Sequence, residues 1–100
     1  MTVRFLVEAE VELDDAIVYY EAQLAGLGVE FAAEIRAGLA RIEEFPDAWQ
    51  LLGRRVRRYR VNRFPYGIVY TIHGDDIFVV AVMHLHRKPD YWQTRATEPE

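Results

Sequence analysis

The spacing of apolar residues changes along the chain and divides it into three parts. A short extended run opens the sequence at residues 3–7, and apolar residues then recur at helical spacing over 13–24 and again over 31–42. From residue 54 onward, apolar and polar residues alternate, which is the period of a β-strand. The pattern predicts one strand, two amphipathic helices and then a group of strands.

The two predicted helices are close in sequence and each has a clear end. Gly26-Leu27-Gly28 interrupts the first helix, and the second ends before Phe45-Pro46, because the residue before a proline disfavours helical backbone. Leu24 is expected to be the last residue of the first apolar face. A short connection makes consecutive helices antiparallel neighbours, so we expect a helical hairpin.

The second half predicts three strands joined by two tight turns. The turns are Asn62–Pro65 and Gly74-Asp75-Asp76, of which the second suits a β-hairpin. Residues 77–85 are apolar on both faces, which is typical of a central strand covered on both sides. These segments predict a three-stranded antiparallel meander.

Together, the segments predict an α+β fold. We expect the N-terminal strand and the meander to form one antiparallel sheet, with the helical hairpin on one face and the arginines on the other. A chain of 100 residues is long enough for one modest core, so we expect a single domain over residues 1–100, with residues 96–100 as a frayed tail.

The composition narrows the class of protein. Hydrophobic residues make up 51% and charged residues 28%, as in an ordered globular protein. The sequence has no cysteine, which excludes disulfides and thiolate metal sites. The longest apolar run, residues 77–83, is far shorter than the roughly 20 residues that span a bilayer, and no signal-peptide pattern precedes it. We therefore expect a cytoplasmic protein without a membrane partner.

Charge is segregated along the chain. The net charge is −4, yet residues 1–50 hold three arginines against eleven acids, and residues 51–100 hold eight arginines and one lysine against five acids. Six of the ten residues at 54–63 are arginine, more than an edge strand needs to avoid aggregation. Guanidinium groups bind phosphates and carboxylates, so we expect an anionic partner here, while the acidic half faces solvent or a basic partner. The candidate partner- or phosphate-binding residues are Arg55, Arg57, Arg58, Arg60, Arg63 and Arg87.

Three motifs in the second half point to a known family. They are Arg57-x-Tyr59-x-Val61-x-Arg63-Phe64-Pro65-Tyr66-Gly67-Ile68-Val69-Tyr70, Gly74-Asp75-Asp76-Ile77 and Val82-x-His84-x-x-Arg87-x-Pro89-x-Tyr91-Trp92-x-x-Arg95. With the order of elements, they resemble the RelE/ParE superfamily of type II toxins. The resemblance implies a growth-inhibiting toxin, associated with plasmid stabilisation, that is encoded beside a small antitoxin which wraps and neutralises it.

The resemblance leaves two mechanisms open. RelE-like members cut mRNA in the ribosomal A site without a metal, and ParE-like members poison DNA gyrase. In the nuclease branch, Arg63 matches an arginine that contacts the scissile phosphate, and Arg87 and Tyr91 match residues that stabilise the phosphate and assist proton transfer. His84 lies near the end of the last strand and has a side chain suited to acid–base work. These four residues would supply a base, an acid and cations with neither metal nor other cofactor.

Arg63 and Tyr91 also have a purely structural interpretation. Arg63 could be a turn arginine paired with Asp75 or Asp90. Tyr91 and Trp92 could close the core beneath the sheet.

Two histidines at the end of the last predicted strand could be metal ligands. His84 and His86 point to the same side of the strand, but no third ligand accompanies them, so no metal site is predicted. For His86 we expect a satisfied and partly buried ring.

Two departures from the nuclease pattern tilt the prediction toward the ParE side. Ribosome-dependent members carry several lysines that face RNA, whereas this chain has only Lys88, and its acidic helices would repel phosphate. The alternatives are a metal-independent mRNA endoribonuclease and, from another class, a non-catalytic binding module for an acidic partner segment. The expected partners are a cognate antitoxin and either DNA gyrase or the ribosome with mRNA, in a dimer or a toxin–antitoxin hetero-oligomer.

Overall fold

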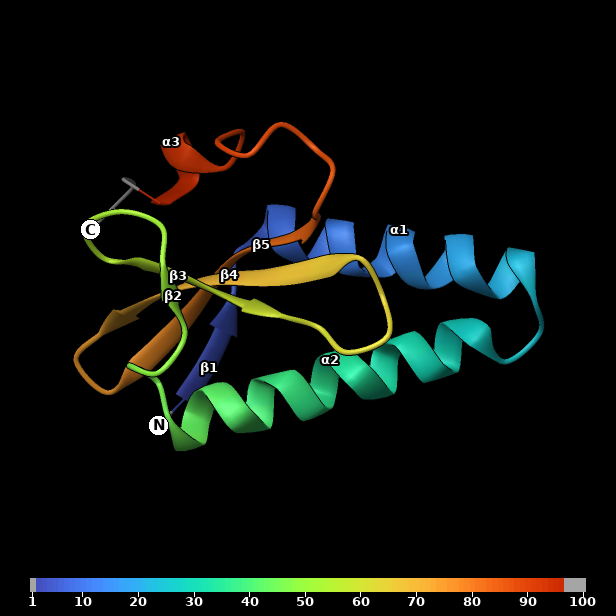
Figure 1. The fold of residues 1–100 in the computed structure, drawn as a ribbon, viewed down its shortest axis with the longest axis horizontal. Coiled ribbons are helices and arrows are strands. Elements are labelled where there is room, and N and C mark those ends of the chain that lie inside the picture. The colour runs from blue at the N-terminus through green and yellow to red at the C-terminus, as the bar shows by residue number, and fades with distance from the viewer. Residues whose placement is uncertain (1, 97–100) are drawn as a thin grey trace.

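A five-stranded sheet carries two long helices on one face, as Figure 1 shows for the computed structural model, which describes residues 2–96. Its strands lie in the order β1-β5-β4-β3-β2. The predicted frayed tail, apart from Ala96, lies outside the described residues. The elements in chain order are β1 (Thr2–Phe5), α1 (Val7–Gln23), α2 (Leu27–Glu44), β2 (Gln50–Leu51), β3 (Val56–Arg60), β4 (Tyr66–His73), β5 (Asp76–His84) and α3 (Gln93–Ala96).

The sheet confirms the predicted meander but is not antiparallel throughout. Strands β3, β4 and β5 pair antiparallel, and the short β2 adds an antiparallel edge strand next to β3. Strand β1 instead pairs in parallel with β5, so the prediction of one wholly antiparallel sheet is wrong at this strand. Four alternating residues do not specify a direction. The direction follows from α1, which begins after Leu6 and packs over β5.

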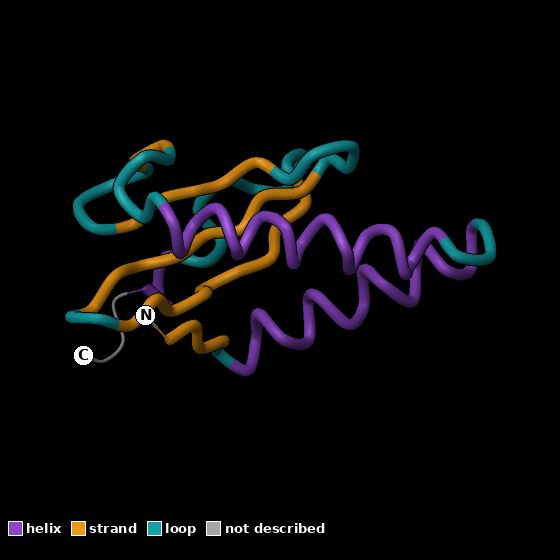
Figure 2. Tube along the Cα trace, turned by 90° about the horizontal axis from the view of Figure 1, so that it is seen from below, coloured by secondary structure: helices purple, strands orange, loops and turns teal. Residues whose placement is uncertain are grey.

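The helical hairpin forms as predicted, and a side chain closes its loop. Gly26 has a φ of +91°, a left-handed conformation that glycine adopts without strain. The Glu21 carboxylate accepts hydrogen bonds from the NH groups of Gly26 (2.7 Å) and Gly28 (2.9 Å), and the first of these lowers the pKa of Glu21. Figures 1 and 2 show this end of the hairpin projecting beyond the sheet.

One residue of the predicted helix face is misplaced. Leu24 is 65% exposed, because α1 ends at Gln23 and Leu24 itself has extended backbone that leaves the helical period.

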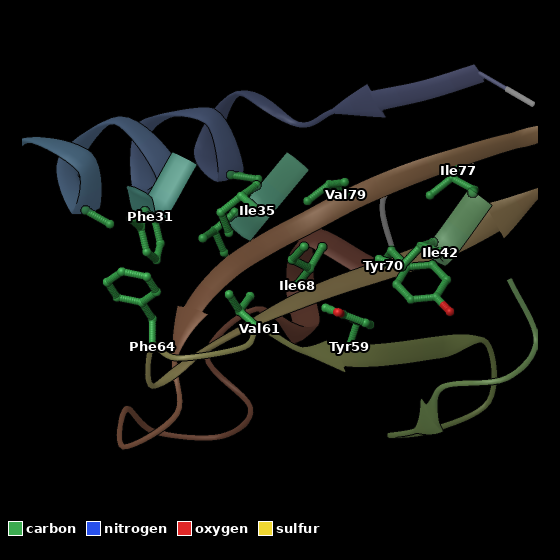
Figure 3. Close-up of a cluster of buried hydrophobic side chains, with 13 residues drawn as sticks. Phe31, Ile35, Ile42, Tyr59, Val61, Phe64, Ile68, Tyr70, Ile77 and Val79 are labelled. Carbon is green, nitrogen blue, oxygen red and sulfur yellow. The ribbon is translucent and has the colours of Figure 1, made fainter. Parts of the chain in front are cut away.

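The main core lies between the hairpin and the sheet (Figure 3). The Tyr70 hydroxyl donates a hydrogen bond to the Pro46 carbonyl (2.6 Å), and burial raises the pKa of Tyr70 to about 12. Gly38 of α2 packs directly on the Tyr59 ring. The buried members of this core are Ala9, Ala16, Phe31, Ile35, Ile42, Tyr59, Val61, Phe64, Ile68, Tyr70, Ile77, Val79 and Val82.

The opposite face of the sheet is covered by apolar packing and not, as predicted, by the arginines alone. The chain after β5 folds back so that Trp92, only 4% exposed, packs under the sheet and confirms its predicted role in closing the core. A bulge at Val80 places Val80 and Ala81 consecutively on this face. We call this group the second core; its buried members are Val69, Val80, Ala81, Met83 and Trp92.

Two classes of feature are absent from the described part of the chain. None of the helices within residues 2–96 has the length and apolar character to cross a membrane. Over the same range, no three residues of the types His, Cys, Asp and Glu are grouped so that they could hold a metal ion.

The contact between α2 and β3 yields a test of the packing. A Cβ at residue 38 would lie 2.7 Å from the Tyr59 ring and 3.1 Å from Ile68, so Gly38→Ala forces a shift that outweighs its gain in helix propensity. We expect the free energy of unfolding to fall by about 1–2 kcal/mol in urea denaturation. Gly53→Ala is the control, because nothing lies within 4 Å of the position that a Cβ would take there; it should change stability by less than about 0.5 kcal/mol. Equal stability of the two variants would contradict the close contact.

Candidate functional site

The strand arginines do not form the single face that the sequence predicted. Arg57 points toward the helix side, where it donates a hydrogen bond to the Trp49 carbonyl (2.8 Å) and lies 3.9 Å from an Asp47 carboxylate oxygen. Arg58 donates to the Gln50 side chain (2.9 Å) on the edge strand β2. Both guanidinium groups are therefore held within the fold.

Three other arginines are free to bind a partner. Arg54, Arg55 and Arg60 are exposed, and none of their side chains has an ion pair or hydrogen bond to another residue in the range 2–96. Arg54 and Arg55 border a pocket of about 430 Å³ between the β2–β3 connection and α3. The pocket is lined by Leu52, Gly53, Arg54, Arg55, Val56, Trp92, Gln93 and Ala96.

Arg63 is committed to the helical layer. It lies in the β3–β4 loop with a φ of +73°, and its guanidinium contacts Glu30 at 2.6 Å and Glu34 at 3.6 Å, both on α2. The hydrogen bond to Glu30 is the main cause that raises the pKa of Arg63. Arg63 is paired with acids, as its structural interpretation predicted, but the predicted partners Asp75 and Asp90 are wrong. The sequence did not reveal that the β3–β4 loop lies over α2, so acids in other turns were expected as partners.

The two histidines lie side by side at the end of β5. The His84 ring is 5.2 Å from the Tyr66 ring and 5.2 Å from the His86 ring, measured between centroids. The His86 amide donates to His84 Nδ1 (3.1 Å). His86 is exposed, so the expectation of a partly buried ring is wrong. The chain leaves the sheet immediately after His84 and carries His86 into solvent.

A cluster around the Glu12 carboxylate gathers the C-terminal residues. Glu12, on α1, accepts hydrogen bonds from the Tyr91 hydroxyl (2.8 Å) and from both terminal nitrogens of Arg95 (3.1 Å each). Arg87 approaches the same carboxylate at 4.0 Å. The Glu12 side chain is 14% exposed, and we call this arrangement the Glu12 cluster.

The Glu12 cluster also completes the backbone hydrogen bonding of β5. Strand β1 pairs with β5 only as far as Val79. Beyond that point, the Val82 amide donates to Glu12 (3.0 Å), and Arg95 donates to the Val80 carbonyl (3.2 Å). An unpaired buried backbone group is costly, so these two side chains replace a missing neighbouring strand.

Within the cluster, the Tyr91 hydroxyl keeps its proton and acts as a hydrogen-bond donor. Burial, followed by the hydrogen bond to Glu12, raises the pKa of its hydroxyl far above the ordinary value of 10.0. The Arg87 guanidinium carbon lies 3.9 Å from the centroid of the Tyr91 ring, a cation–π contact. Arg87 and Tyr91 are thus brought together, but around a protein carboxylate that occupies the position of an external anion.

The four predicted nuclease residues therefore fall into three settings. Arg63 is paired with α2, the His84 ring meets the Tyr66 ring edge to face, and Arg87 and Tyr91 belong to the Glu12 cluster. Sequence reasoning missed Glu12, which looks like one more acid of an acidic helix. Arg95 was within the quoted motif, four residues after Tyr91, but no role was predicted for it.

Comparisons with known proteins give one family and one related fold. The family model described as "ParE toxin of type II toxin-antitoxin system, parDE" matches residues 3–89. A solved structure titled "Chromosomal ParDE TA system from P. aeruginosa" superposes with a TM-score of 0.75 at 13% identity, covering 86% of this chain and 97% of that chain. A search of curated proteins gave no match. The family match confirms the resemblance drawn from the motifs, and the structural likeness confirms the fold class.

The Glu12 cluster predicts a large effect of one substitution. Glu12→Ala leaves the Val82 amide without its acceptor, and it leaves the guanidinium of Arg95, which is 17% exposed, without its carboxylate and with only the Val80 carbonyl. We expect the free energy of unfolding to fall by about 2–3 kcal/mol. Amide hydrogen exchange should also accelerate in residues 87–96. Glu10→Ala, an exposed acid on the same helix, is the control and should change stability by less than about 0.5 kcal/mol. Similar stability of the two variants would show that the cluster does not hold the C-terminal segment.

Proposed function

The chain belongs to the ParE toxin family of type II toxin–antitoxin systems, and from this premise we propose that it inhibits growth by poisoning DNA gyrase. Family membership implies a cognate antitoxin as its partner. We further propose that residues 1–100 act as a single toxin domain in the cytoplasm.

The dispersal of the four nuclease candidates supports a mechanism without RNA cleavage. Phosphodiester cleavage needs a base, an acid and cations that converge on one phosphate. Here the Arg63 guanidinium is already paired with the Glu30 carboxylate, and the Arg87 guanidinium already faces the Glu12 carboxylate. Tyr91 keeps its proton and already donates it to a carboxylate. A phosphate entering this site would have to displace Glu12, and it would be repelled by that charge.

A test of this mechanism separates gyrase poisoning from mRNA cleavage. We expect induction without antitoxin to stop colony formation, and we expect primer extension on RNA from these cells to show no discrete cuts in translated messages. The purified protein should produce DNA breaks together with purified gyrase. Arg63→Ala and His84→Ala should each keep toxicity within a few-fold, provided that circular dichroism shows them folded. In a nuclease, either change would lower cleavage by about two powers of ten or more. If the wild-type chain produces codon-phased mRNA cuts and both variants abolish them, the nuclease mechanism replaces gyrase poisoning. Normal growth on induction of folded wild-type protein would contradict a toxin function.

We assign the electrostatic part of antitoxin binding to the free arginines. The side chains of Arg55 and Arg60 lack internal partners within the described range, whereas those of Arg57, Arg58, Arg63 and Arg87 each have at least one. An acidic segment of the antitoxin would be drawn to the free pair without breaking an existing contact. Rim charges of this kind act on the rate of encounter more than on the lifetime of the complex.

Binding kinetics test this assignment. Replacing Arg55 and Arg60 together by Ser should slow association with the immobilised antitoxin several-fold at low salt and flatten its dependence on ionic strength. The control replaces Arg4 and Arg36 by Ser, which removes the same net charge at exposed sites away from β3. It should change the association rate much less. Equal slowing in both variants would mean that only net charge matters, and faster dissociation with unchanged association would make these arginines contact anchors.

A further inference from the structure

Helix α1 carries a second apolar stripe, on the side away from the core. Val7, Val11 and Val18 are 71%, 52% and 68% exposed. Their spacing of four and seven residues places them within one narrow arc of the helix surface. The inward arc of the same helix is occupied by the buried Ala9 and Ala16. We call the three residues the valine stripe.

The valine stripe has the spacing of a coiled-coil seam. Residues 7, 11, 14, 18 and 21 follow the alternating four- and three-residue steps of a heptad. Three of these five seam positions are valine. At the middle one stands Asp14, an exposed acid that fixes which partner charge can face it. A seam with one central charge accepts a helix with a matching opposite charge.

The positions beside the seam give the stripe a single sign of charge. In coiled coils, the residues that flank the seam select the partner by their charge. Here the exposed flanking residues are Glu8, Glu10 and Asp15. Helix α1 contains no lysine and no arginine. The surface is therefore an apolar ridge bordered by acids on both sides.

This charge distribution excludes the α1 helix of a second copy as the occupant. Two α1 helices packed along their stripes would bring acids against acids in either orientation, and like charges across a seam are destabilising. A basic helix would instead place lysine or arginine opposite Asp14 and opposite the flanking acids. A helix of 17 residues is about 25 Å long, enough to pair with a partner helix of similar length.

We propose that the valine stripe of α1 is a docking surface for a basic amphipathic helix of another protein. The apolar seam of the partner covers Val7, Val11 and Val18, and its flanking cations pair with the acids of α1. This surface lies on the helical layer, whereas the free arginines lie at the β2–β3 side of the sheet, so the chain presents a cation-binding face and an anion-binding face. The valine stripe has this role whichever target the toxin has.

The test uses the purified full-length chain and synthetic helical peptides of 21 residues. The probe peptide has lysine at the seam position that would face Asp14, leucine at the other seam positions of three heptads, and lysine at the flanking positions. One control peptide has glutamate in place of lysine, and another has the composition of the probe in an order without a seam. We expect fluorescence anisotropy to detect the probe alone, with binding that weakens as salt rises. Amide chemical shifts should change over residues 7–18.

Matched variants locate the site. Replacing Val11 and Val18 together by Ser should weaken probe binding at least tenfold. The control replaces Leu24 and Val29 by Ser, which removes equally exposed apolar side chains outside the stripe (65% and 69% exposed) and should leave binding unchanged. Asp14→Lys should also weaken the probe at least fivefold. Equal binding of the peptide without a seam, equal effects of the two double variants, or no binding of the probe would each overturn the proposal.

Discussion

The charge of one buried carboxylate organises the C-terminal third of this protein. Glu12 belongs to α1, yet it accepts hydrogen bonds from the backbone of β5 and from two residues of the segment that follows β5. A largely buried carboxylate is tolerated only when donors compensate for the loss of water, and Arg95, Tyr91 and Val82 provide them. Without that acceptor, the segment that brings Trp92 under the sheet would have little to hold it.

The same interaction links fold to function. Because the Glu12 carboxylate lies against Arg87 and Tyr91, two of the four residues that resemble a nuclease centre are held in a structural cluster. Positive charge without a partner in the described residues gathers elsewhere, on Arg54, Arg55 and Arg60 beside β3. Segregated charge along the sequence thus becomes two distinct surfaces, one acidic on α1 and one basic beside β3.

Local patterns predicted most of the fold. The helical periods, the glycine loop and the Gly74 turn gave the hairpin and the meander at nearly their observed positions, since each depends on neighbouring residues. The parallel direction of β1 and the edge strand β2 were not predicted. Both depend on contacts between distant segments, and runs of four and two residues carry too little pattern to specify them.

The candidate site was less predictable than the fold. The sequence predicted one arginine face, and it could not show that Trp49 and Gln50 would bind Arg57 and Arg58. The partners of Arg63 lie far from it in sequence, on α2. Ion pairs between remote segments follow from the tertiary packing, which is why the family motifs did not predict the partners of these residues.

The extra residue in β5 has a consequence for comparing this chain with its relatives. Before the bulge, Ile77 and Val79 point to the helices; after it, Val82 does, so the inward positions change from odd to even numbers. An aligned relative without the bulge would need a gap at Val80. An ungapped alignment would assign inward residues to the outer face through the rest of the strand and would carry that error to the histidines beyond it.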